Sequence, residues 1–198
     1  MSQHAVFSPS SAHRCVHCPG SIVMERGEKD SGSSFADEGT AAHTIIEWSL
    51  NNDVKPDHYK GELMRVVNGV TRTPDMMVDF FSQGGVIERD TSWEVDDDML
   101  GHLNVFTDIV DQLCEIEGAK LFVEERVSTS HVLKIKDQFG TVDALIVAPG
   151  ELIVVDYKHG RGVEVSAEEN EQLMMYALGA LVLGVLIFLG WLWRDRRS

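Results

Sequence analysis

Residues 140–160, GTVDALIVAPGELIVVDYKHG, carry the secondary-structure signals from which the fold of this chain is predicted. Two runs rich in β-branched residues, Thr141–Ala148 and Glu151–Lys158, flank the dipeptide Pro149-Gly150. Proline fixes φ at about −65° and glycine accepts a positive φ, so this dipeptide favours a tight turn between antiparallel strands. The sequence therefore predicts a β-hairpin.

The register of this hairpin brings two acidic residues together. If the loop has two or four residues, the numbers of facing residues have a constant sum, and Asp143 lies opposite Asp156. Directly opposite side chains are about 5 Å apart. Because side chains alternate along a strand, Lys158 is expected on the same face as Asp156, and Tyr157 on the other. Two acids and an amine are thus predicted to converge.

Like charges that face each other destabilise a sheet, and a divalent cation would resolve the conflict. Mg²⁺ and Mn²⁺ prefer oxygen ligands and keep bound waters for substrate phosphates. Lys158 would then orient or deprotonate the attacking water, or offset charge that develops on a phosphate. The alternative is that Asp143 and Asp156 are solvated acids at a sheet edge, with Lys158 as their surface partner.

Composition sets bounds on the class of protein. The chain has 198 residues, of which 43% are hydrophobic and 25% charged, as in a globular domain with a substantial core. Its net charge of −15 argues against broad adhesion to nucleic acid, so a DNA contact would need a local basic patch or metal ions. Three cysteines without a signal peptide indicate a reducing cytoplasm. Cys15 and Cys18 form a CxxC, which would be half of a metal site if a second pair existed, but only Cys114 remains and the potential histidine ligands are scattered.

Periodicity and turn signals predict the remaining elements. A strand is expected over Lys120–Ser128. Helices are expected over residues 9–16, 35–50, 61–68, 75–82, 93–117 and from 168 to 176, continuing to about Trp193. This order predicts an α/β (α+β) domain in which helices flank a small central mixed sheet.

Five sequence blocks point to a known family. They are SPSSAHRC…CPGS, EGTAAH, GTVDALIV, VVDYKHG and NEQLMMYALGA, in this order over most of residues 4–180. Together they resemble a phage- and prophage-encoded family of RecB-like nucleases in the PD-(D/E)xK superfamily, related to lambda-type and CRISPR-associated exonucleases. The resemblance implies a restriction-endonuclease-like core in residues 1–180 and exonuclease-like, metal-dependent hydrolysis of DNA.

The resemblance also implies roles for individual residues. His43, Asp143 and Asp156 correspond to the ligands of Mg²⁺ or Mn²⁺, and Asp143, Asp156 and Lys158 to the catalytic set. Gln172 and Tyr176 correspond to a Q-x3-Y motif that positions the DNA strand or the active-site helix. DNA is the implied substrate, and phage recombination or replication proteins are the implied partners.

An iron–sulfur cluster is not expected. Some RecB-like nucleases use one cysteine near the N-terminus and three near the C-terminus for such a cluster. Cys18 matches the first position, but no cysteine follows Cys114.

The C-terminal segment departs from the family pattern. Relatives continue well beyond the Q-x3-Y helix, whereas residues 181–198 here predict a hydrophobic helix with a basic end, as in a truncated chain. The stretch Leu173–Trp193 has no charged residue and is long enough to span a bilayer, which predicts membrane association of a cytoplasmic protein. Three hypotheses follow: an active nuclease, a truncated relative that binds DNA or metal without cleavage, and a membrane-tethered scaffold.

Overall fold

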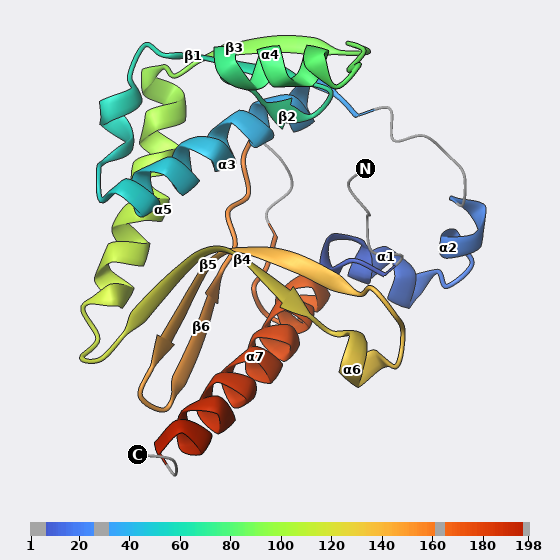
Figure 1. The fold of residues 1–198 in the computed structure, drawn as a ribbon, viewed down its shortest axis with the longest axis vertical. Helices are drawn as coiled ribbons and strands as arrows, with labels where there is room; N and C mark the ends of the chain where they lie inside the picture. Colours follow the sequence, from blue (N-terminus) through green and yellow to red (C-terminus); the bar gives the residue numbers. More distant parts are fainter. Residues whose placement is uncertain (1–6, 26–31, 161–164, 196–198) are drawn as a thin grey trace. The chain divides into compact units, whose positions relative to one another are not determined.

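A computed structural model describes residues 7–25, 32–160 and 165–195, with side chains through residue 185. The chain has a mixed α/β architecture and divides into two compact units (Figure 1). Unit 1 contains Met1–Glu28, Leu113–Asp156 and Glu164–Ser198. Unit 2 contains Lys29–Gln112 and Tyr157–Val163. Each unit has its own three-stranded antiparallel sheet.

The sheet of unit 1 has the order β4-β5-β6, with strands β4 (Lys120–Ser128), β5 (Phe139–Ala148) and β6 (Glu151–Val155). Ala148 faces Glu151 across the two-residue loop Pro149-Gly150, and Gly150 has a φ of 84°. The predicted hairpin and its register are therefore confirmed. The expectation of a mixed sheet is wrong, because both strand pairs are antiparallel.

One long helix covers this sheet in unit 1. Helix α7 (Glu171–Asp195) packs against all three strands (Figure 1). The packed core contains Val127, Val142, Leu145, Tyr176 and Ala180. Gly179 permits the close approach, because a Cβ there would lie 2.9 Å from Cβ of Val127. The other helices of unit 1 are short: η1 (Pro9–Ser11), α1 (Ala12–His17), α2 (Ser21–Met24) and α6 (Ser130–Leu133).

The predicted membrane segment coincides with much of α7. Among the helical residues that the structure describes, no stretch is both long and apolar enough to cross a bilayer. The membrane association expected for Leu173–Trp193 is therefore not supported. The side chains of residues 186–198 lie outside the described part of the chain.

Unit 2 pairs its sheet with a buried helix. Helix α3 (Ser34–Asn52) packs against all three strands of the order β2-β1-β3 and buries Ala41, Ala42 and Ile45 completely. The strands are β1 (Leu63–Val67), β2 (Val70–Thr71) and β3 (Asp90–Glu94). The remaining elements are η2 (Pro56–Tyr59), α4 (Pro74–Ser82) and α5 (Asp97–Cys114), which ends two residues beyond the unit.

Two predictions in this region are wrong. A helix was expected over Gly61–Asn68, but these residues form β1 and its turn into β2. Asn68 and Gly69 have φ values of 52° and 73°, the positive angles that a two-residue hairpin loop requires. The helix expected from Trp93 begins at Asp97, because Trp93 belongs to β3. The side chain of Asp96 accepts a hydrogen bond from the backbone N–H of Met99 and sets the start of α5.

Candidate functional site

Three acidic residues lie at one level of the sheet in unit 1. Ala144 faces Val155, so the next facing positions along β5 and the end of β6 are Asp143 and Asp156. On the other side of β5, the pairs of Val123 with Ala144 and of Glu125 with Val142 bracket Glu124 and Asp143. Asp143 is thus central, with Glu124 on one neighbouring strand and Asp156 just after the other.

The central carboxylate is buried. Asp143 has a relative exposure of only 7% and lies on the middle strand of the sheet. A carboxylate oxygen of Asp143 and one of Glu124 lie within 4.8 Å of each other. The alternative in which Asp143 is a solvated acid at a sheet edge is therefore wrong.

Glu124 is the ligand candidate that sequence reasoning missed. It has a φ of 50° within a strand, a left-handed conformation that costs a residue with a Cβ about 1–2 kcal/mol. The ladder pairs on both sides of Glu124 and Asp143 keep one register. The available signal was the Glu124-Glu125 dipeptide, which interrupts an otherwise apolar strand.

The predicted Q-x3-Y residues lie against Asp156. Gln172 Nε2 donates hydrogen bonds to Asp156 Oδ1 at 3.1 Å and to the hydroxyl oxygen of Tyr176 at 3.2 Å. Burial raises the pKa of Tyr176 to about 12, and the negative charges of Asp156, Asp143 and Glu124 add to this shift, although the bond from Gln172 opposes it. The tyrosine hydroxyl therefore lies in the field of the three acids.

Gly140 lies where Pro9 and Tyr176, residues of two other sequence blocks, pack against β5. A Cβ at Gly140 would lie 2.4 Å from Cγ of Pro9 and 2.8 Å from Cε1 of Tyr176. Real Cβ atoms do not approach other heavy atoms so closely. The absence of a side chain at Gly140 therefore allows η1 and α7 to pack together on β5.

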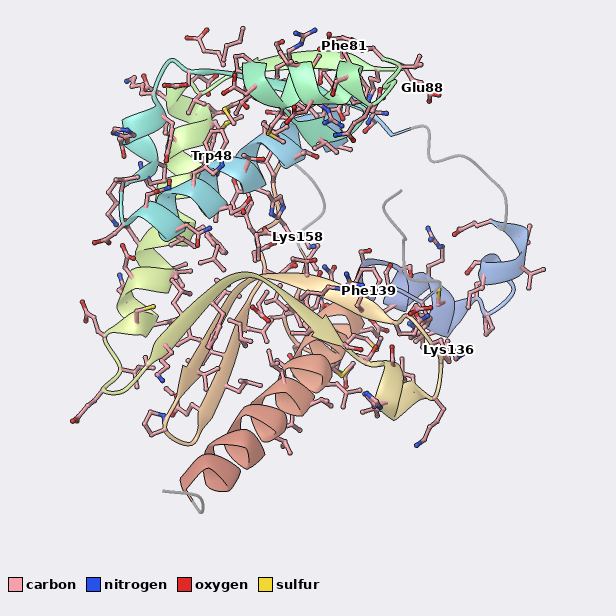
Figure 2. All side chains as sticks on the ribbon, in the orientation of Figure 1. Trp48, Phe81, Glu88, Lys136, Phe139 and Lys158 are labelled. Atoms are coloured by element: carbon pink, nitrogen blue, oxygen red, sulfur yellow. The ribbon has the colours of Figure 1, made fainter. Side chains whose placement is uncertain are left out.

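Asp156 and Lys158, the two residues of the D-x-K pair, do not lie in a strand as predicted. Strand β6 ends at Val155, so the alternation that was expected to put Asp156 and Lys158 on one face does not apply. The division between the units also falls after Asp156, so that Asp156 belongs to unit 1 and Lys158 to unit 2. Lys158 is exposed (Figure 2), whereas Tyr157 is buried.

Aromatic packing in unit 2 holds the segment that carries Lys158. The Tyr157 ring meets the rings of His43 and Phe106 edge-on, each at a centroid distance of 5.4 Å. Its hydroxyl is 3.0 Å from Nδ1 of His159, and burial raises the pKa of Tyr157 to about 12. His43 is half-buried on α3, which matches the helix predicted over residues 35–50.

The residues of unit 1 fit a hard divalent cation. Carboxylate oxygens are the ligands that Mg²⁺ and Mn²⁺ prefer, and Mg²⁺ commonly binds through one or two carboxylates and several waters. Glu124 and Asp143 offer carboxylates on neighbouring strands, and Asp156 offers a third directly after the end of β6. Gln172 and Tyr176 provide polar groups beside them but no further charge.

Comparison with known proteins identifies the family of this chain, but it assigns no activity to that family. No solved structure matches it. A protein-family match covers residues 4–188, nearly the same range as the five sequence blocks. By this match, the chain belongs to the family described as "Protein of unknown function (DUF2800)".

Proposed function

We propose that this chain is a Mg²⁺- or Mn²⁺-dependent deoxyribonuclease of the RecB-like PD-(D/E)xK type, and that the sheet of unit 1 holds the ion. The observation that carries the proposal is the alignment of Glu124, Asp143 and Asp156 at one level of this sheet. Carboxylate oxygens are the ligands that Mg²⁺ and Mn²⁺ prefer, and three carboxylates at one level of a sheet, one of them buried, suit such an ion.

The chain's own residues would hold and orient the site. Glu124, Asp143 and Asp156 supply oxygen ligands, and Gln172 orients Asp156 through its 3.1 Å hydrogen bond. When bound, the ion would lower the pKa of its water and stabilise negative charge on the scissile phosphate.

In the proposed hydrolysis, the oxygen of water forms a bond to phosphorus. The bond from phosphorus to the leaving sugar oxygen breaks, and that oxygen gains a proton. Lys158, two residues after Asp156, would either deprotonate the attacking water or offset charge on the phosphate. The substitutions Lys158→Arg and Lys158→Gln separate these roles, because arginine keeps the charge but does not act as a base.

The proposal is tested by a nuclease assay on linear and circular DNA, each single- and double-stranded, with Mg²⁺, with Mn²⁺ and with EDTA. We expect cleavage only with metal, and preference for linear DNA if the action is exonuclease-like. Asp143→Asn and Glu124→Gln should each reduce the rate by at least about 100-fold, as expected for the loss of a metal ligand. Glu125→Gln, the same change one residue along β4, is the matched control and should retain activity.

Two results would reject the proposal in different ways. Full activity of Asp143→Asn would show that the carboxylates of unit 1 are not the catalytic site. Metal binding by the wild type without cleavage of any substrate would instead identify the second hypothesis from the sequence, a relative that binds DNA or metal but does not cleave.

A further inference from the structure

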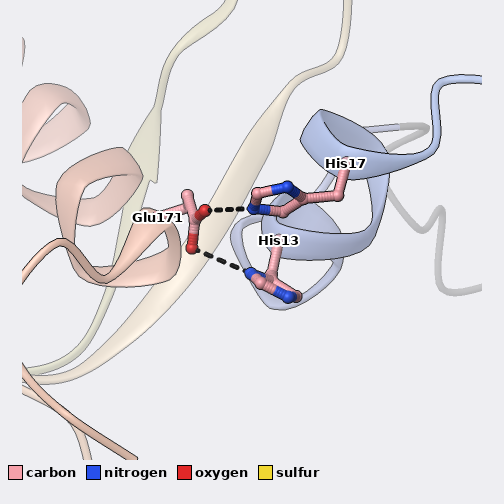
Figure 3. A group of neighbouring side chains, drawn as sticks. All are labelled: His13, His17 and Glu171. Carbon is pink, nitrogen blue, oxygen red and sulfur yellow. Dashed lines mark hydrogen bonds and ion pairs between the residues drawn. The ribbon is translucent and has the colours of Figure 1, made fainter.

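A second group of side chains that could hold a metal ion lies elsewhere in unit 1 and shares no residue with the carboxylate site. His13 and His17 are four residues apart at α1, and both rings point to Glu171, the first residue of α7 (Figure 3). His13 Nδ1 lies 3.2 Å from Oε2 of Glu171, and His17 Nε2 lies 3.0 Å from Oε1. The centroids of the two imidazole rings are 4.4 Å apart.

These distances are close to those around a tetrahedral zinc ion. Zinc lies about 2.0–2.1 Å from imidazole nitrogen and carboxylate oxygen, so neighbouring ligand atoms in a tetrahedron are about 3.4 Å apart. The two nitrogen–oxygen distances differ from this value by only a few tenths of an ångström, and one ligand atom from each residue lies within 4.8 Å of the others. A small rotation of the Glu171 carboxylate would bring one oxygen toward both rings.

The side chains also have the right chemistry and access. Two neutral imidazoles and one carboxylate form a ligand set that zinc sites use, and the i, i+4 spacing puts both rings on one side of a helical turn. The side chains of His13 and His17 are 77% and 61% exposed, so an ion can enter from solvent. Glu171 is 23% exposed and is therefore held more firmly than the two histidines.

We infer that His13, His17 and Glu171 form a binding site for Zn²⁺ or a similar divalent transition metal, with water at the remaining positions. The ion would tie α1 to the first turn of α7. Because Gln172 follows Glu171 directly and bonds to Asp156, the ion would also fix the end of the helix that orients this carboxylate. The inference does not rest on nuclease activity, since none of its ligands belongs to the carboxylate site.

The test is a calorimetric titration of the full chain with Zn²⁺ in buffer containing excess Mg²⁺, which occupies carboxylate sites. Co²⁺ serves as a spectroscopic probe, because its visible absorption reports coordination by nitrogen. We expect the wild type to bind one equivalent, with a rise in Tm of about 5 °C at saturating Zn²⁺. The double variant His13→Ala/His17→Ala should bind at least about 100-fold more weakly. His131→Ala, which removes an exposed histidine from α6 in the same unit, should bind normally.

Further variants exclude other ligands. Glu171→Gln keeps the shape of the side chain and should also weaken Zn²⁺ binding and remove the rise in Tm. Cys18→Ser should leave the affinity unchanged. Wild-type affinity in the double histidine variant, or loss of binding in Cys18→Ser alone, would overturn the assignment. So would a wild type that binds no Zn²⁺, which would leave the three side chains as a hydrogen-bonded cluster only.

Discussion

Replacing Asp143 by asparagine should stabilise the metal-free protein, although Asp143 is buried. Its carboxylate oxygen lies within 4.8 Å of one from Glu124, and two unit charges at that distance repel by about 3.5 kcal/mol at an effective dielectric constant of about 20. Other contacts of the two carboxylates offset part of this repulsion. We therefore expect a gain of about 2 kcal/mol in the free energy of unfolding, which raises Tm by about 4–8 °C for a chain of this size.

Metal should reverse the order of stability. In wild-type protein, Mg²⁺ or Mn²⁺ at about 100 times its Kd adds about 2.7 kcal/mol to the stability of the folded state. The Asp143→Asn variant lacks the central charged ligand and should gain much less. The variant should thus be the more stable protein in EDTA and the less stable one in saturating Mg²⁺. This reversal in the order of stability distinguishes a carboxylate that binds a metal ion from a buried carboxylate that binds none.

Thermal unfolding followed by circular dichroism, in EDTA and in a Mg²⁺ series, measures both effects. Asp79→Asn, the same change at an exposed position of α4, is the control and should shift Tm little in either buffer. If Asp143→Asn were the less stable protein in EDTA, repulsion between Asp143 and Glu124 would not dominate the stability of the metal-free site. The reasoning would also fail if both proteins gained equal stability from Mg²⁺.

Three further predictions concern the stability of the two units. Asp37 is fully buried and accepts hydrogen bonds from Arg89 Nε and Nη2 at 2.7 and 2.8 Å. Asp37→Asn should therefore lower the free energy of unfolding, measured by urea titration, by about 3 kcal/mol. A loss below about 1 kcal/mol would contradict this. Gly179→Ala should cost about 1–3 kcal/mol, because its Cβ would meet Val127 at 2.9 Å, and unchanged stability would show that α7 shifts freely. Because the pKa of Tyr176 is raised to about 12 in the folded protein, its contribution to stability is complete below about pH 10 and is lost as pH rises through 12. Stability measured between these pH values should therefore fall less in Tyr176→Phe than in wild type, and equal slopes would argue against this.

The central hairpin could be predicted because local signals determine it. Pro149-Gly150 sets both the turn and the loop length, and the loop length sets the register that brings Asp143 opposite Asp156. By contrast, the turn at Asn68-Gly69 is equally local, but the apolar residues around it also suit a helix, so periodicity alone predicts the wrong element there.

The third acid could not be found in this way. Glu124 lies opposite Asp143 only because β4 pairs with β5 across a connection that contains α6, and local periodicity does not fix such a register. The prediction that Asp156 and Lys158 share one face of a strand was wrong for a related reason. The chain leaves the sheet at Val155, and Tyr157 packs between aromatic rings of α3 and α5.

The start of α7 shows how a local cap positions residues for two sites. Apolar periodicity predicted a start near Glu168, but the helix begins at Glu171, because the Asn170 side chain accepts a hydrogen bond from the backbone N–H of Leu173 at 3.0 Å. Successive residues in a helix point about 100° apart. With the start fixed by Asn170, Glu171 faces the histidines of α1 while Gln172 faces Asp156. An uncapped, frayed first turn would weaken both contacts together. The cap at Asn170 therefore supports the proposed zinc site and the carboxylate site at once.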